Sequence, residues 1–171
     1  MNYMKLIKLL YMLDREALLR WGRPVTFDTY FSMRLGPVLS EVHDLITEPQ
    51  DPDLGPSFWG IHISDPSRFS VGLVDDPGSD ELSEAEMQLI KEVWAKYGHF
   101  APFDLVEHLH KNLPEWKDVQ SGRVPIEYAD ILKAGGKPPD EISAVEEDLR
   151  HLERVRRMFA APLVSTQLVS R

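Results

Sequence analysis

The sequence predicts a mainly α protein, a single compact helical domain with one small antiparallel β hairpin, and hence an α+β fold. Apolar residues recur at helical spacing through most of the chain. One predicted helix begins with a complete capping motif, and only two short runs have β character. The length of 171 residues suits one domain, because domains usually span about 100–200 residues.

The first helix is expected from about Tyr3 to Trp21. Its apolar residues nearly encircle the axis between Leu6 and Leu13, which is typical of a helix covered on most sides. Gly22 stands where a left-handed cap would end the helix, and Pro24 prevents its continuation. These signals predict a long, largely buried first helix.

The next part of the chain contains the predicted hairpin. We expect a turn-like stretch from Thr26 to Pro37 and then a short amphipathic helix over 38–47. Residues 48–57 are rich in Pro, Asp and Gly and should form a loop. Two β-like runs follow, Phe58 to Ser64 and Phe69 to Val74, joined by four turn-forming residues. Because a two-stranded hairpin is marginal alone, it should pack on the helices.

The clearest local signal is the sequence LSEAE at 82–86. Ser83 and Glu86 have the spacing of a capping box, in which each side chain accepts a hydrogen bond from the other residue's backbone. The helix that starts here should end at Gly98, and its apolar stripe predicts a buried Trp94.

Three more helices complete the predicted fold. One begins at Pro102 and reaches about Lys111, a short one fits Pro125 to Lys133, and a long one runs from Asp140 to about Phe159. The final residues lose the helical pattern and should form a tail or a docking strand. The predicted organisation is therefore one domain over 1–159 and a C-terminal tail over 160–171.

Composition excludes several classes of protein. The chain contains no cysteine, which removes disulfides, thiol catalysis and cysteine-based metal sites. No apolar run approaches the roughly 18 residues that a membrane span needs, and no signal-peptide pattern opens the chain. We therefore expect a cytoplasmic protein that does not bind membranes.

The net charge of −9 is spread unevenly. Residues 47–148 hold 22 Asp and Glu against eight Lys and Arg, whereas 149–171 hold five Arg and one Glu. An acidic middle would repel phosphate backbones, so direct nucleic-acid binding is not expected. The same acidic surface can also serve only to keep the chain in solution.

The sequence contains no motif of the common catalytic classes, such as a phosphate-binding loop, GxSxG or HExxH. The nearest approach to a metal site is His99, Asp104, His108 and His110. His108 and His110 are two apart and cannot share a helix face, whereas His108 and Asp104 can. A small metal-dependent enzyme is thus a minor alternative, and we expect no metal, no cofactor and no catalytic residue.

Some side chains suit a partner surface. A Trp in a loop either closes a core edge or anchors a partner, and Arg residues near a helix end either complement the helix dipole or form a basic docking face. The predicted partner-binding residues are Phe58, Trp59, Trp116, Arg154, Arg156 and Arg157.

Several segments together resemble the signatures of the SocA-like antitoxin, or Panacea, domain family. Residues 5–38 contain a Lys-Leu-Leu-Tyr helix, an Asp-Arg-Glu end, a Gly-Arg-Pro turn and a Gly-Pro-Val step. The second block is LSEAE at 82–86, followed by a helix that ends in Tyr-Gly. The third is HKNLPEWKD at 110–118 together with the step over 122–126. The blocks stand in the family's order and cover about residues 5–135.

The resemblance implies a mostly helical domain with a small β hairpin that acts without catalysis. Such domains are similar to antitoxins that neutralise a cognate toxin, often encoded beside them, by direct protein contact. Others resemble adaptors that deliver the toxin to a cellular protease, and family members occur on phages and mobile genetic elements. Family members usually have a longer first helix before the Lys-Leu-Leu-Tyr segment, so an interface that uses those turns would be altered here.

Overall fold

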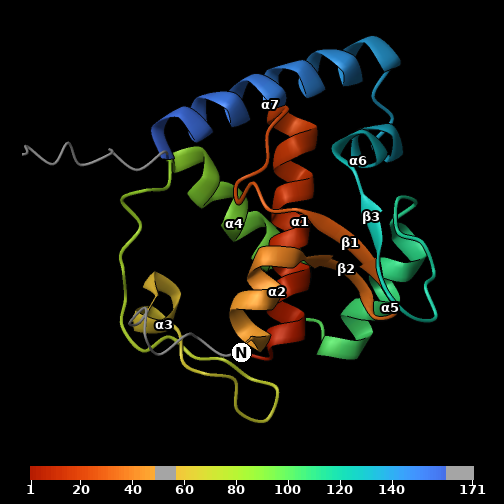
Figure 1. Ribbon diagram of the computed structural model, residues 1–171. Helices are drawn as coiled ribbons and strands as arrows, with labels where there is room; N and C mark the ends of the chain where they lie inside the picture. The colour runs from red at the N-terminus through yellow and green to blue at the C-terminus, as the bar shows by residue number, and fades with distance from the viewer. Residues whose placement is uncertain (49–56, 161–171) are drawn as a thin grey trace, which may run out of the picture.

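Helix α1 (Tyr3–Trp21) runs through the middle of the computed structural model, and the other elements pack around it (Figure 1). The structure describes residues 1–48 and 57–160. The side chain of Asn2 accepts a hydrogen bond from the Lys5 backbone at the start of α1. Gly22 ends the helix in the left-handed conformation at φ 70°, which a residue without Cβ adopts freely. The predicted bounds and cap of this helix are confirmed.

The sheet has three short antiparallel strands in the order β2-β1-β3. Strands β1 (Tyr30–Met33) and β2 (Gly36–Leu39) form a hairpin with a two-residue turn, and β3 (Val124–Ile126) pairs with the other edge of β1. The small antiparallel element of the predicted fold class is confirmed, but its position is not. The turn-like stretch predicted here was wrong, since two four-residue strands give little periodic signal.

The hairpin predicted over 58–74 was also wrong. The first run contains the short helix α3 (Phe58–His62), capped by the hydroxyl of Ser57, which accepts from the Gly60 backbone. Pairing between the two runs is reduced to an isolated bridge between Ile63 and Leu73. Trp59 and Ile63 pack on one apolar cluster while Ile61 between them is 47% exposed. This pattern fits helical spacing, since a strand would place all three side chains on one face.

The remaining helices follow the predicted order. The short helix predicted over 125–133 begins three residues later than expected, because Val124–Ile126 pair with β1 instead. The long helix is confirmed with a shift of one residue at each end. Their bounds are α2 (Ser40–Thr47), α4 (Glu84–Tyr97), α5 (Pro102–Asn112), α6 (Tyr128–Ala134) and α7 (Pro139–Ala160).

The main apolar core surrounds α1. It includes fully buried residues of α1, the sheet and the later helices, and Leu149 of α7 closes it on one side. A second, smaller cluster joins the start of α1 to β2, α2 and Val71. Representative members of the main core are Tyr11, Met12, Leu18, Leu39, Leu89, Leu105, Ile131 and Leu132.

The prediction that Trp94 is buried was wrong, because this side chain is 51% exposed. The buried stripe of α4 runs through Leu89, Val93 and Tyr97 at four-residue spacing, and Trp94 lies next to that stripe. The ammonium of Lys5 lies 5.6 Å from the centre of the Trp94 ring. This tryptophan therefore contacts a cation at the surface instead of filling the core.

Candidate binding site

The buried carboxylate of Asp14 attaches the segment after α1 to the helix itself. Its Oδ1 accepts hydrogen bonds from the backbone N–H groups of Val25 at 2.8 Å and Thr26 at 2.9 Å. Its Oδ2 accepts from the Thr26 hydroxyl and, at 2.9 Å, from the Tyr30 hydroxyl. Burial raises the pKa of Asp14, and the four hydrogen bonds oppose that rise. This carboxylate supports the fold.

A second buried carboxylate, Glu115, attaches the segment after α5 to the same helix. Its Oε1 accepts from the Tyr11 hydroxyl at 3.0 Å and from Arg15 Nε at 2.7 Å. Burial and the neighbouring Glu115 charge raise the pKa of Tyr11 well above its usual range. Glu115 Oε2 is buried without a described hydrogen-bond partner.

The next residue, Trp116, packs at the edge of the main core. Its indole N–H donates to the Met33 carbonyl at 3.1 Å. The Trp116 ring stacks on the His110 ring, with centroids 3.8 Å apart and an interplanar angle of 7°. This arrangement favours the interpretation in which the loop tryptophan closes the core.

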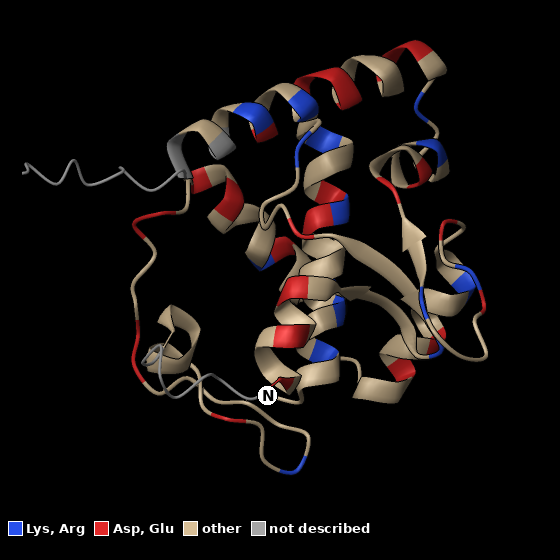
Figure 2. Cartoon of the chain, viewed as in Figure 1, with Lys and Arg blue, Asp and Glu red and all other residues tan. Residues whose placement is uncertain are grey.

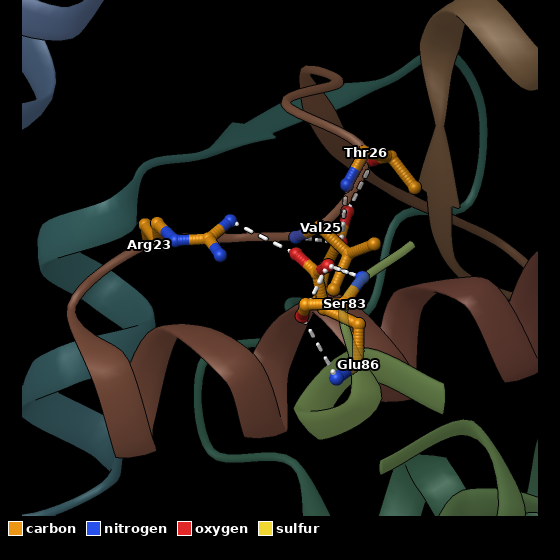
Figure 3. Close-up of polar contacts among 6 residues, drawn as sticks. Arg23, Val25, Thr26, Ser83 and Glu86 are labelled. Carbon is orange, nitrogen blue, oxygen red and sulfur yellow. Dashed lines mark hydrogen bonds and ion pairs between the residues drawn. The ribbon is translucent and has the colours of Figure 1, made fainter. Parts of the chain in front are cut away.

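The capping box of α4 is confirmed, and it also binds the turn after α1 (Figure 3). Glu86 Oε2 accepts from the backbone N–H of Ser83 at 2.9 Å and from its hydroxyl at 2.7 Å. Glu86 Oε1 lies 3.0 Å from Arg23 Nη1. The hydrogen bonds from Ser83, and then the Arg23 charge, lower the pKa of Glu86. Two motifs about 60 residues apart in sequence thus meet at one carboxylate.

Lys8 is the buried cation of α1, with only 1% of its surface exposed. Its ammonium donates to the Pro37 carbonyl at 2.6 Å, and burial lowers its pKa from 10.5 to about 7. Gly36 lies directly against it, since a Cβ at this glycine would be 3.3 Å from Lys8 Cε. The nearby His110 Nε2 is buried without a described partner, and burial and the Lys8 charge lower the pKa of His110.

Lys8 also lines a cavity of about 500 Å³, which we call the α1 cavity. It lies between the start of α1, the β1–β2 turn and the start of α5, and most of its lining is apolar. Phe69 and Phe103 line it although they are 70% and 67% exposed. Its basic lining residues among the described part of the chain are Lys8, Arg34 and His43, and no Asp or Glu of that part lines it.

The predicted partner-binding residues are not brought together. Phe58 is 72% exposed on α3, whereas its neighbour Trp59 is half-buried in the second apolar cluster. Arg154 is exposed on α7, a helix that runs along the top of Figure 1, whereas α3 lies low on the left of the same view. Trp116 follows α5 and lies elsewhere again. The side chains of Arg156 and Arg157, and residues 161–171 of the tail predicted over 160–171, lie outside the described residues, while Ala160 is the last residue of α7.

Charge is segregated along α7 (Figure 2). Its acidic residues gather on the first half of the helix, and Arg150 and Arg154 follow them. A shallow hollow of about 380 Å³ lies here, lined by Glu147 and Glu153 as well as by these two arginines. Cations near a helix C-terminus and anions near its N-terminus complement the helix dipole. This distribution agrees with the interpretation in which the arginines complement the dipole of α7.

The histidines of the candidate metal site pack against an aromatic ring. The rings of His99 and His108 lie 4.3 and 4.9 Å from that of Phe100. Within residues 1–48 and 57–160, no group of three His, Cys, Asp or Glu could hold a metal ion. In the same part of the chain, no helix is long and apolar enough to cross a membrane.

The capping signal that predicts the role of Glu86 has no counterpart for the α1 cavity. Phe69 lies in a run predicted as a strand and Phe103 in a predicted helix, yet both are exposed at the cavity. The one available signal was Lys8, a cation within the apolar run from Leu6 to Leu13.

Comparison with known proteins identifies the family. The family model described as Antitoxin SocA-like, Panacea domain, matches residues 6–117, which include Lys8, Asp14, Glu86 and Glu115. No curated protein and no solved structure matches the chain significantly. Since the matched region covers more than half of the chain and contains the network that joins α1 to its neighbours, the chain belongs to the SocA-like antitoxin, or Panacea, domain family.

Proposed function

We propose that this protein is the antitoxin of a toxin–antitoxin pair and that it neutralises its cognate toxin by direct binding in the cytoplasm. The family match over residues 6–117 carries this proposal. The contacts of three carboxylates also support the proposal. Asp14, Glu86 and Glu115 each join one structural element to another, which is a structural and not a catalytic role. The exposed aromatic side chains at the α1 cavity suit a partner surface.

Neutralisation of this kind requires a sizeable interface. A stable protein–protein complex buries about 1,200–2,000 Å² in total. With a net charge of −9, the chain should associate fastest with a basic toxin face, and the association rate should fall as salt is added. An association rate that is equal in low and high salt would contradict this electrostatic role.

The proposal is tested by co-expression with the neighbouring open reading frame of the same operon. The neighbour alone should arrest growth, and co-expression of this chain should restore it. Co-purification of the two proteins at an undiminished toxin level would support neutralisation by binding. A harmless neighbour, or continued arrest with this chain well expressed, would refute the proposal.

The adaptor alternative predicts a different result in the same cells. An adaptor lowers the amount of toxin, and inactivation of the responsible protease restores both toxin and growth arrest. Direct neutralisation leaves the toxin half-life unchanged or longer. The interface residues predicted from the sequence, from Phe58 to Arg157, stay predictions for either mechanism.

A further inference from the structure

We propose that the α1 cavity is the docking site for one segment of the partner, a segment that carries a carboxylate beside a large apolar side chain. This inference deepens the proposed function, which supplies the identity of the partner as the cognate toxin. It places the docking site at the start of α1 and not at α3 or α7.

The size and the lining of the α1 cavity fit an apolar side chain. A volume of about 500 Å³ lies in the usual range of ligand sites, about 300–1,000 Å³. Phe103 is 67% exposed and Phe69 is 70% exposed, so most of their ring surface stays in contact with water. Exposed aromatic side chains around a concave surface are typical of interaction sites, since binding removes that apolar area from water.

The charge of the cavity fits a carboxylate. An ammonium has three N–H donors, and the buried Lys8 has one described acceptor, the Pro37 carbonyl. Arg34 is exposed on the β1–β2 turn and has no described ion pair. Without an acidic lining residue in the described chain, this is a cationic site on a protein of net charge −9. A partner carboxylate would pair with the exposed Arg34 in a charge-assisted hydrogen bond, and the charge of the buried Lys8 would add a longer-range attraction.

The β1–β2 hairpin fixes the position of Lys8. The Pro37 carbonyl binds its ammonium at 2.6 Å, and Gly36 packs on its side chain so closely that a Cβ would lie 3.3 Å from Cε. A cation that is already ordered loses little further entropy when a partner binds. A buried, incompletely paired ammonium costs free energy in the folded chain, and a partner carboxylate would offset part of that cost.

The first experiment measures the affinity of purified chain for purified toxin. Phe103→Ser and Lys8→Met should each weaken binding about tenfold or more, because one loses apolar contact and the other loses the charge. The matched control is Leu73→Ser, which changes an apolar side chain of similar exposure, 64%, outside the cavity and should leave the affinity within about twofold. Thermal melting of each variant checks the fold. Wild-type affinity in both cavity variants would overturn the inference.

A second experiment does not need the toxin. The probe is N-acetyl-L-phenylalanine, a carboxylate beside an aromatic side chain, and the control is the uncharged N-acetyl-L-phenylalaninamide. Millimolar acid should shift the backbone NMR signals of Leu35, Val38 and Phe103 more strongly than the amide does, and Lys8→Met should abolish this preference. Equal shifts with acid and amide, or shifts confined to α3, would overturn the inference.

The two experiments separate the inference from the proposed function. If co-expression shows no neutralisation but the acid probe binds in the cavity, the antitoxin role fails and the cationic docking site stands. If the wild type neutralises the toxin while cavity variants and probe show no effect, the antitoxin role stands and the docking site lies elsewhere.

Discussion

Asp14 and Lys8 are two ionisable side chains on the same helix, each only 1% exposed, and their surroundings differ. Asp14 accepts four hydrogen bonds from the segment that follows α1. Lys8 has three donors and one described acceptor, and it borders a cavity. A fully paired buried charge holds elements together, whereas the charge of an incompletely paired one beside a cavity can still attract a ligand. The difference separates a structural residue from a candidate binding residue.

The largest expected effect comes from removing the structural charge. Asp14→Ala should lower the free energy of unfolding by about 5 kcal/mol, because it leaves several buried donors without an acceptor, at roughly 1–3 kcal/mol each. Urea denaturation measures this change. Asp148→Ala on the exposed face of α7 is the control and should change stability by less than about 0.5 kcal/mol. A loss of stability below about 1 kcal/mol for Asp14→Ala would show that Asp14 is not the structural residue that the contrast with Lys8 requires.

The second prediction concerns the pH dependence that Lys8 creates. Below pH 7 its ammonium is charged in both the folded and the unfolded chain, so its burial cost applies in full. Between about pH 7 and 10.5 the folded chain releases the proton first, and the contribution of Lys8 to stability rises with pH. The advantage of Lys8→Met over wild type should therefore shrink by up to about 4 kcal/mol between pH 6 and 10.

Denaturation of both proteins across this pH range measures the prediction. His110 is coupled to Lys8, since burial and then the Lys8 charge hold the pKa of His110 below its usual range. Groups that do not interact with Lys8 affect wild type and variant alike, so above pH 7 the difference between the two proteins reports on Lys8. A difference that stays constant from pH 6 to pH 10 would show that Lys8 titrates near its ordinary pKa in the folded chain.

A smaller effect is expected where Gly36 packs on Lys8. Gly36→Ala should cost about 2–3 kcal/mol, because its φ of 98° disfavours an L side chain and the new Cβ would press on Lys8 Cε at 3.3 Å. Gly122 has a φ of 78° but open space around it, so Gly122→Ala should cost only about 1 kcal/mol. Equal losses of stability in the two variants would show that Gly36 does not position Lys8.

The smallest effect should come from the exposed tryptophan of α4. Trp94→Ala should cost less than about 1 kcal/mol, since half of the side chain is exposed and its contact with Lys5 is at the surface. Leu89→Ala, on the buried stripe of the same helix, should cost about 2–5 kcal/mol. Denaturation of the pair tests the assignment of the two helix faces.

The sequence predicted the parts of this fold that local signals determine. The bounds of α1 follow from apolar spacing and from Gly22, and the start of α4 follows from Ser83 and Glu86. Such signals act within a few residues, so they need no knowledge of the rest of the fold. The family resemblance added the expectation of a helical partner-binding domain, and the family itself is confirmed.

The other parts of the fold depend on tertiary contacts, which local sequence signals do not reveal. The β1–β2 hairpin depends on pairing with Val124–Ile126 about ninety residues later, and α3 depends on packing Trp59 against the second cluster. The candidate site could not be predicted for the same reason. Phe69 and Phe103 come together at the α1 cavity only after folding, and the apolar run around Lys8 does not reveal that a cavity lies beside its side chain.

The central place of α1 has a consequence for how the chain folds. This helix is synthesised before the segments that cover its apolar surface, whose residues are as distant as Ile131 and Leu149. Contacts this far apart in sequence slow folding, because a long loop must close before they form. During most of its synthesis the chain therefore exposes the apolar residues of this helix, and we expect chaperones to bind the nascent protein before it can fold.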